Sequence, residues 1–212
     1  MKPTFFQKHP LFKDLLTFAI FAGAVIFGTI IINTYVYRSY NVIGSSMENT
    51  LLNGDRVVVD RLAVSLAHFA GQEYVPERGK IVVFANGNST GPMTCNPPEN
   101  SNEDQYIIKR VIAFAGERVV VRDGIMTVYT DEYPAGFVYD ENWRVSDTDG
   151  PKEYTSGEVD MIVPEGEIFV SGDNREGSHS WDSRNGLGTI PLCRLMGPVA
   201  VRIFPFDRMR FF

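Results

Sequence analysis

The N-terminal part of this sequence holds a long apolar segment without a formal charge, and no other feature limits the possible folds as strongly. Residues 15–37 contain no Asp, Glu, Lys or Arg, and residues 15–32 are almost wholly apolar. At about 1.5 Å per residue, residues 15–37 would span roughly 34 Å as a helix, which exceeds a bilayer core of about 30 Å. A helix buried in a soluble protein rarely runs this far without one polar face. The segment therefore predicts a transmembrane anchor.

The residues on either side of the segment predict its orientation. Residues 1–14 contain three lysines, whereas Arg38 alone follows the segment closely. Because positive residues are retained in the cytoplasm, we expect a cytoplasmic N-terminal tail and an extracytoplasmic domain over residues 38–212. No small-x-small cleavage site follows the apolar run, so the pattern favours a single-pass anchor in the plasma membrane over a cleavable signal peptide.

The chain after the anchor predicts a mainly β fold, with an antiparallel sheet or barrel-like domain. Short runs of β-branched and aromatic residues alternate with turn-rich stretches, and residues 61–70 alone favour a short helix. Asp123 and Gly124 form a strong hairpin signal between two of the runs. Several short strands with hairpin turns are typical of antiparallel domains. The expected strands are residues 56–60, 80–84, 106–114, 118–121, 125–129, 167–171 and 199–204.

Two stretches are expected as loop insertions, and the cysteines fall outside any recognisable framework. Residues 85–104 are polar and rich in Asn, Pro and Gly, whereas residues 130–160 are acidic and rich in turn formers. Cys95 and Cys193 lie far apart and belong to no metal-ligand pattern, so no metal site is expected. The two cysteines could pair in an oxidising compartment, and the sequence leaves that question open.

The charge balance excludes one class of function. The formal net charge is −6 and the chain has no long Lys/Arg run, which makes it a poor nucleic-acid binder. With 212 residues, the chain is long enough for one anchor and one domain with a real core.

Lys109 is the first candidate for chemistry. It lies in the expected strand 106–114, where Ile107 and Val111 share its face. Burial over apolar surface lowers the pKa of a lysine, and a lysine with a lowered pKa can act as a general base. Taken by itself, this segment favours a lysine that extends its ammonium to water from a strand edge.

Ser46 is the second candidate. Gly44 and Ser45 leave space beside it, as an attacking hydroxyl requires, and backbone N–H groups nearby could stabilise an oxyanion. A simple turn or capping serine fits the same residues. The third candidate is the segment 172–188, where Asp173 with Arg175 and Asp182 with Arg184 could form a hydrogen-bonded loop that braces a site.

Together these pieces resemble the ordered motif set of type I signal peptidases, the Ser-Lys membrane proteases of the peptidase S26 type. The four boxes are residues 46–51, 78–84, 109–112 and 172–184, in the family's order behind an anchor. The resemblance covers about residues 10–205. It implies a serine endopeptidase that removes N-terminal signal peptides from secreted preproteins at the membrane surface. It further implies contact with the lipid bilayer, a monomer, and no cofactor.

The resemblance also implies roles for single residues. Ser46 would be the nucleophile that forms the acyl-enzyme, Lys109 its general base, Ser180 a hydroxyl that orients the lysine, and Asp182 with Arg184 a bracing pair. The residues that would line shallow pockets for small substrate side chains are Val42, Ile43, Met47, Leu51, Ile107 and Ile108.

The sequence departs from the family pattern at four places, one of which is residues 114–117, where Phe-Ala-Gly-Glu stands for the usual Leu-Pro-Gly-Asp. Asn49 stands where the family usually has proline. Gly44 stands where some members have a serine that assists the oxyanion, so the Ser46 N–H would carry most of that task. The last box is two residues longer than usual, which makes Ser178 a competitor of Ser180.

Other functions remain open at this point. A Ser-His-Asp hydrolase could use His179 with Asp182, or His68 with Asp60, although the chain has no G-x-S-x-G motif. An anchored β-domain without catalysis is a second alternative, and the self-cleaving repressor type, which lacks an anchor, is a third. The late aromatics either rest on lipid or complete a β-core; they are Phe204, Phe206, Phe211 and Phe212.

Overall fold

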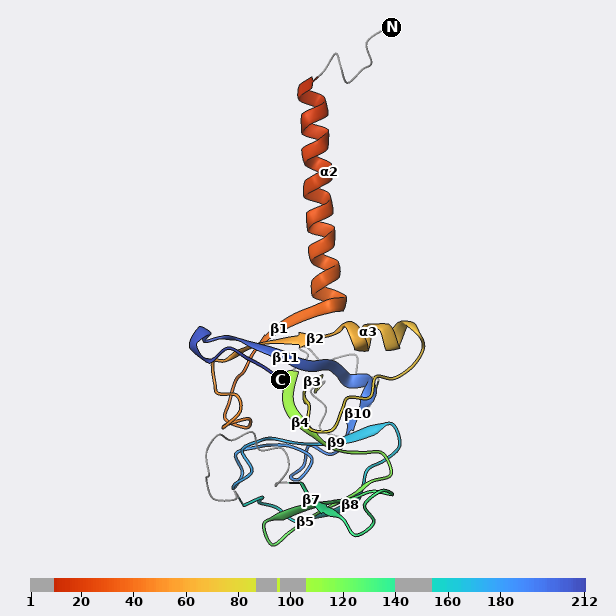
Figure 1. The fold of residues 1–212 in the computed structure, drawn as a ribbon, viewed down its shortest axis with the longest axis vertical. Helices are drawn as coiled ribbons and strands as arrows, with labels where there is room; N and C mark the ends of the chain where they lie inside the picture. Colours follow the sequence, from red (N-terminus) through yellow and green to blue (C-terminus); the bar gives the residue numbers. More distant parts are fainter. Residues whose placement is uncertain (1–9, 87–94, 96–105, 140–153) are drawn as a thin grey trace.

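An isolated N-terminal helix leads into a β domain. The computed structural model describes residues 10–86, 95, 106–139 and 154–212. Helix α2 (Pro10–Ile31) continues as a π-helical turn, η1 (Ile32–Val36), and points away from the domain (Figure 1). The stretch Leu11–Val36 is long and apolar enough to cross a membrane, and no part of its most apolar window is buried by the rest of the protein.

The domain consists of two antiparallel sheets, as expected from the sequence. The larger sheet has the strand order β1-β2-β11-β3-β4-β9-β10, with β12 paired to β11, and the smaller one has the order β7-β6-β5-β8. Helix α3 (Leu62–Phe69) follows β2. The strands are β1 (Tyr37–Asn41), β2 (Arg56–Asp60), β3 (Ile81–Ala85), β4 (Tyr106–Phe114), β5 (Arg118–Arg122), β6 (Ile125–Tyr129), β7 (Phe137–Val138), β8 (Val159–Ile162), β9 (Glu167–Ser171), β10 (Ile190–Pro191), β11 (Leu195–Phe204) and β12 (Arg210–Phe211).

Most of the expected strands are confirmed, and the largest difference is at β11. This strand begins at Leu195, four residues before the expected start at 199. Gly197 and Pro198 look like strand breakers in the sequence, but here they belong to a bulge where the register with β3 shifts. A Cβ on Gly197 would lie 2.1 Å from the Asp60 carbonyl oxygen, so the bulge needs glycine for the close approach of β2.

The expected loop over residues 130–160 is partly wrong, because two strands of the small sheet begin or end in it. β7 pairs with β6, and β8 pairs with β5. Their short, half-exposed sequences give little alternation for a pattern to detect. Residues 140–153 of this loop, and residues 87–94 and 96–104 of the other, lie outside the described residues.

One of the three buried hydrophobic clusters includes side chains of the loop that follows β1. This cluster includes Met47 and Leu51 from the loop after β1, together with side chains of β2, β3 and β11. A disulfide joins Cys95 to Cys193, which lies in the 3₁₀ turn η3 (Leu192–Arg194) before β11. The cysteine question that the sequence left open is therefore answered by a bond that spans 98 residues.

Candidate active site

The loop between β1 and β2 carries Ser46 and is held from two sides. Met47 is buried, and its carbonyl accepts hydrogen bonds from Thr50 and Leu51 N–H groups at 2.9 and 2.8 Å. This turn forms with Asn49 in place of the proline usual in the family. Within the described residues, the Ser46 N–H has no hydrogen-bond acceptor, so it is available to an oxyanion.

Strand β4 brings Lys109 to the Ser46 hydroxyl. Lys109 Nζ lies 2.7 Å from Ser46 Oγ and 3.0 Å from the Ile108 carbonyl oxygen. The lysine is only 4% exposed, although it carries a charge in its ordinary state. The two residues are 63 positions apart in the sequence and meet because β4 lies beside the loop that follows β1.

Burial sets the acid-base behaviour of this amine. Desolvation lowers the pKa of Lys109 to about 8, against smaller opposing effects of the Asp182 and Asp173 charges, while the Arg184 charge lowers it further. An amine with this pKa is partly neutral near physiological pH and can accept a proton. The reading of Lys109 as a lysine that reaches out to water is therefore wrong.

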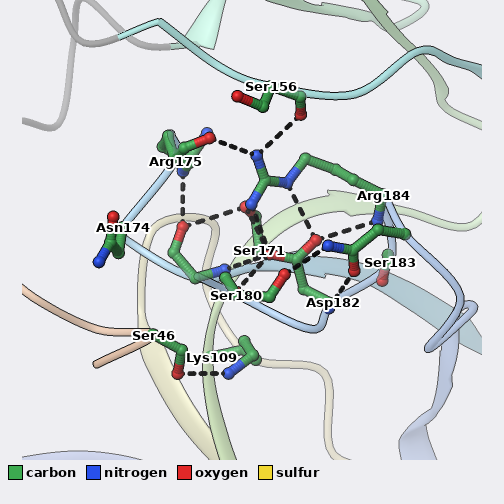
Figure 2. A network of polar contacts seen from close by, with 12 residues as sticks. Ser46, Lys109, Ser156, Ser171, Asn174, Arg175, Ser180, Asp182, Ser183 and Arg184 are labelled. Carbon is green, nitrogen blue, oxygen red and sulfur yellow. Dashed lines mark hydrogen bonds and ion pairs between the residues drawn. The ribbon is translucent and has the colours of Figure 1, made fainter. Parts of the chain in front are cut away.

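A buried polar network surrounds Asp182 beside Ser46 and Lys109 (Figure 2). Asp182 Oδ2 accepts hydrogen bonds from Ser180 Oγ at 2.6 Å, Arg184 Nη2 at 2.8 Å and Gly172 N at 2.9 Å. Asp182 Oδ1 accepts from Arg184 Nε at 2.9 Å. Burial by itself would raise the pKa of the Asp182 carboxyl, but the hydrogen bonds and charge of Arg184, together with the hydrogen bonds from Ser180 and Gly172, hold that pKa below its usual value. The carboxylate therefore stays ionised and rigid.

The network touches the backbone of the loop that carries Ser46. Asn174 N donates to the Ser46 carbonyl oxygen, and Asn174 Nδ2 donates to the Ser45 carbonyl oxygen, both at 3.1 Å. A Cβ on Gly172 would lie 2.2 Å from Ser180 Oγ and 2.3 Å from the Ser46 carbonyl oxygen. Glycine at this position therefore allows the two segments to lie directly against each other.

The sequence-based pairing of the acidic and basic residues is half right. Asp182 pairs with Arg184, but Asp173 pairs with Arg110 of β4, at 2.8 and 2.5 Å, and Arg175 Nε donates to the Gly172 carbonyl oxygen. Neighbours along the chain were the only partners that sequence spacing could suggest. The Arg110–Asp173 pair ties the strand of Lys109 to residues 172–175 from the strand's opposite face.

Ser180, and not Ser178, belongs to the buried network. Ser180 is buried and donates to Asp182, whereas Ser178 is exposed. In the part of the chain that the structure describes, Ser180 makes no hydrogen bond to Lys109. The family resemblance implied a contact between Ser180 and the lysine. In this structure Ser180 instead contacts the Asp182 carboxylate, and the charge of that carboxylate acts on Lys109.

Ser46 and Lys109 open onto a cleft of about 430 Å³. Four of the residues expected to line substrate pockets do line it, namely Val42, Ile43, Ile107 and Ile108, and so does Gly44. Met47 and Leu51 do not, because both side chains turn into the core beneath the loop. Several other residues also line the cleft, although no local sequence pattern predicts this position for them; they are Tyr40, Asn41, Ser45, Val57, Val83, Tyr106, His179 and Trp181.

The described residues offer no Ser-His-Asp arrangement. Both Asp182 oxygens accept hydrogen bonds from Arg184, Ser180 and backbone groups, and His179 is exposed on the rim of the cleft. Asp60 Oδ1 accepts from the Leu62 N–H instead of from His68. One group of potential metal ligands, Glu73 with the two cysteines, has its thiols used by the disulfide.

Comparison with known proteins gives this arrangement a family. The family model described as signal peptidase, peptidase S26, matches residues 13–204. Signal peptidase I of Bacillus licheniformis is 29% identical over 205 residues, covering 96% of this chain and 94% of that protein. Probable signal peptidase I-2 of Synechocystis sp. is 33% identical over 178 residues, covering 84% and 68%. Signal peptidase I T of Bacillus subtilis is 30% identical over 184 residues, covering 85% and 81%.

The matched range runs from the anchor helix to the last residue of β11 and includes all four sequence boxes. The resemblance that the boxes predicted is thereby confirmed, together with its mainly antiparallel fold. This chain belongs to the signal peptidase family, peptidase S26, and is a serine endopeptidase.

Proposed function

We propose that the protein removes signal peptides from secreted preproteins with a catalytic dyad of Ser46 and Lys109. One observation carries this proposal: the Lys109 amine lies 2.7 Å from the Ser46 hydroxyl and is almost fully buried. Burial lowers the pKa of Lys109 to about 8, so a useful fraction of the amine is neutral at physiological pH. A binding domain without catalysis would have no use for so costly a buried amine.

The proposed reaction is acyl transfer. In the neutral amine, the hydrogen bond reverses: the Ser46 hydroxyl donates to the Nζ lone pair, and Nζ takes the proton as Oγ attacks the substrate carbonyl carbon. The Ser46 N–H stabilises the oxyanion that forms on the carbonyl oxygen. The Lys109 ammonium then protonates the leaving amine. Water, activated by the neutral lysine, hydrolyses the acyl ester and regenerates Ser46.

The supporting residues act on this dyad without touching the substrate. Asp182 and Arg184 hold Ser180 and Gly172 in one rigid cluster behind the dyad. The Asp182 carboxylate favours the charged lysine and so prevents burial from lowering the pKa even further. We therefore propose that Ser180 is a positioning residue, which holds the Asp182 carboxylate by its hydrogen bond.

Substrate binding is proposed for the apolar part of the cleft. Val42, Ile43, Ile107 and Ile108 line it above Ser46 and Lys109. Short apolar walls accept small side chains and exclude large ones by overlap, which suits the residues before a signal-peptide cleavage site. Met47 and Leu51 are withdrawn from this role, because they lie in the core.

The setting is proposed as the outer face of the plasma membrane. The stretch Leu11–Val36 would cross the bilayer, with residues 1–9 in the cytoplasm and the β domain outside. Only Tyr37–Ile43 separate this span from the loop of Ser46, so the site lies near the lipid surface. We propose that the protein works as a monomer, because the whole proposed site comes from one chain.

A cleavage assay on a model preprotein tests the dyad. Full-length wild type, Ser46→Ala and Lys109→Met are compared in detergent micelles, with Ser45→Ala as the matched control beside the nucleophile. We expect loss of cleavage in the first two variants and retention in the control, all with wild-type circular dichroism. Processing that survives in folded Ser46→Ala would refute the nucleophile. Activity retained in Lys109→Met but lost in His179→Ala would instead support a histidine mechanism.

A further inference from the structure

Helix α3 carries three apolar side chains on one exposed face. Leu62, Leu66 and Phe69 are 43, 58 and 71% exposed. Their spacing of four and three residues places them along one side of the helix. The helix itself packs against β11 and η1. An apolar face of this kind on an otherwise acidic protein requires a partner that is itself apolar.

The helix is attached to the end of the expected membrane span. Ser65 Oγ donates to the Tyr35 carbonyl oxygen at 2.9 Å, and Arg61 N donates to the Val36 carbonyl oxygen at 2.8 Å. The rings of Tyr35 and Phe69 lie with their centroids 5.6 Å apart. One of the three exposed side chains thus continues directly from the aromatic residue at the end of the anchor.

The orientation and depth of α3 fit the membrane surface. Figure 1 shows α3 lying across the direction of α2, so its axis is parallel to the plane of a bilayer that α2 would cross. The 26 residues of the apolar span extend about 39 Å as a helix, several ångströms more than a hydrocarbon core of about 30 Å. Tyr35, in the last turn, therefore falls at the headgroup level that tyrosine prefers, and α3 lies at the same level.

A second apolar group lies on the other side of the anchor. Phe204, Phe206 and Phe211 are exposed in the hairpin between β11 and β12. Figure 1 shows this hairpin and α3 on opposite sides of the base of α2, at a similar height. The aromatic tail is therefore divided: these three side chains face outward, whereas Phe212 packs against the core.

We propose that α3 is an interfacial helix that inserts Leu62, Leu66 and Phe69 into the outer leaflet of the bilayer. A single anchor leaves the domain free to rotate and tilt, but contacts on both sides of the anchor fix its height and rotation. Strand β1 lies between them and leads directly into the cleft, so the contacts hold the cleft at a set distance from the lipid. The inference rests on the proposed membrane crossing of α2, and it does not depend on the catalytic dyad.

Fluorescence quenching by brominated lipid tests the insertion. Leu66→Trp and Phe69→Trp are placed singly in a full-length chain whose own two tryptophans are replaced by phenylalanine, and reconstituted in phosphatidylcholine vesicles. Ile125→Trp is the matched control, since Ile125 is similarly exposed but lies on β6 in the small sheet. We expect blue-shifted emission and a loss of emission with brominated acyl chains at positions 66 and 69, and neither effect at 125. Red-shifted, unquenched emission at both α3 positions would overturn the proposal.

A second measurement separates membrane placement from catalysis. The double variant Leu66→Glu/Phe69→Glu is expected to cleave a vesicle-inserted preprotein several-fold more slowly and to retain wild-type cleavage of a soluble peptide in detergent. If the double variant cleaves both substrates at the wild-type rate, α3 has no role in placing the cleft. If the wild type cleaves neither substrate, the proposed function fails, but the quenching result still decides whether α3 lies in the lipid.

Discussion

At the scale of single residues, the site depends on the balance of effects on one amine. Desolvation dominates the pKa of Lys109, and the carboxylates of Asp182 and Asp173 offset only part of it. The amine reaches about pKa 8 because water is excluded from it. The Ser46 hydroxyl and the Ile108 carbonyl oxygen are its hydrogen-bond partners. A group held in this way is poised for proton transfer, and its titration is observable in two independent ways.

The first is the pH dependence of cleavage. Since only neutral Lys109 can accept the proton, kcat/KM is expected to rise about tenfold per pH unit on the acid side and to level off above a pKa of about 8. The profile is measured on a short soluble peptide, so that membrane binding does not contribute. A flat rate between mildly acidic and alkaline pH would show that no such amine controls the reaction.

The second is the stability of Lys109→Met. The folded-state pKa of about 8 lies below the ordinary value of 10.5, so the folded state disfavours the proton and stability rises as pH increases through this window. Below pH 8 the full penalty applies, on the order of 3 kcal/mol. Methionine removes the penalty but also two hydrogen bonds, so we expect a net gain of about 1–2 kcal/mol at pH 7 that shrinks towards pH 10.5. Urea unfolding of the full chain in micelles at both pH values measures this difference in the free energy of unfolding. A variant less stable than the wild type at pH 7 would show that burial of the charged amine carries no such penalty.

At the scale of elements, the nucleophile loop owes its position to the segment after β9. Asn174 holds the Ser45 and Ser46 carbonyl oxygens, and Gly172 allows the segment to lie against them without a side chain between. The loop after β1 is therefore held by two sets of contacts: its own side chains pack in the core, and the backbone of residues 172–175 lies beside it. Neither side by itself determines where the Ser46 hydroxyl points.

Gly172→Ala tests this contact. The new Cβ would meet Ser180 Oγ at 2.2 Å and the Ser46 carbonyl oxygen at 2.3 Å, so the nucleophile loop must move. A displacement of about 1 Å at a reacting group can lower the rate about 100-fold, and we expect that loss mainly in kcat. Gly28→Ala, which has open space around its Cβ, is the matched control. Wild-type kcat in folded Gly172→Ala would show that the close approach is not needed.

At the scale of the whole molecule, one covalent bond joins distant parts of the β domain. Cys95 belongs to the long connection between β3 and β4, and Cys193 lies just before β11. In the large sheet, β3 lies between β11 and β4, the strand that carries Lys109. A cross-link over 98 residues restricts the unfolded chain strongly, so it stabilises the sheet without any part in the chemistry.

Removal of the disulfide is expected to cost stability and not catalysis. Cys95→Ser/Cys193→Ser is predicted to lower the free energy of unfolding by about 2–4 kcal/mol, as is typical for a bond that closes a long loop. Urea unfolding with and without a reducing agent measures the difference, and peptide cleavage at low temperature checks the site. A reduced wild type as stable as the oxidised protein would refute the prediction.

The sequence alone determined what depends on local pattern. The uncharged run 15–37 was long enough to predict an anchor, and alternation within runs such as 106–114 located strands because it reflects burial on one face. The four boxes identified the family and pointed to Ser46 and Lys109 as a pair. Expectations failed where the tertiary fold overrides local pattern, as at the β11 bulge around Gly197.

Which residues meet, and which lose contact with water, depends on how the strands fold against one another. Met47 lies in the core instead of the cleft, Asp173 pairs with Arg110 instead of Arg175, and Trp181 is among the residues that line the cleft. The pKa of Lys109 belongs to the same class, because desolvation comes from everything that covers the amine, and most of those groups are distant in the chain. Sequence spacing carries no record of such contacts, since they form only when separate strands are folded against one another.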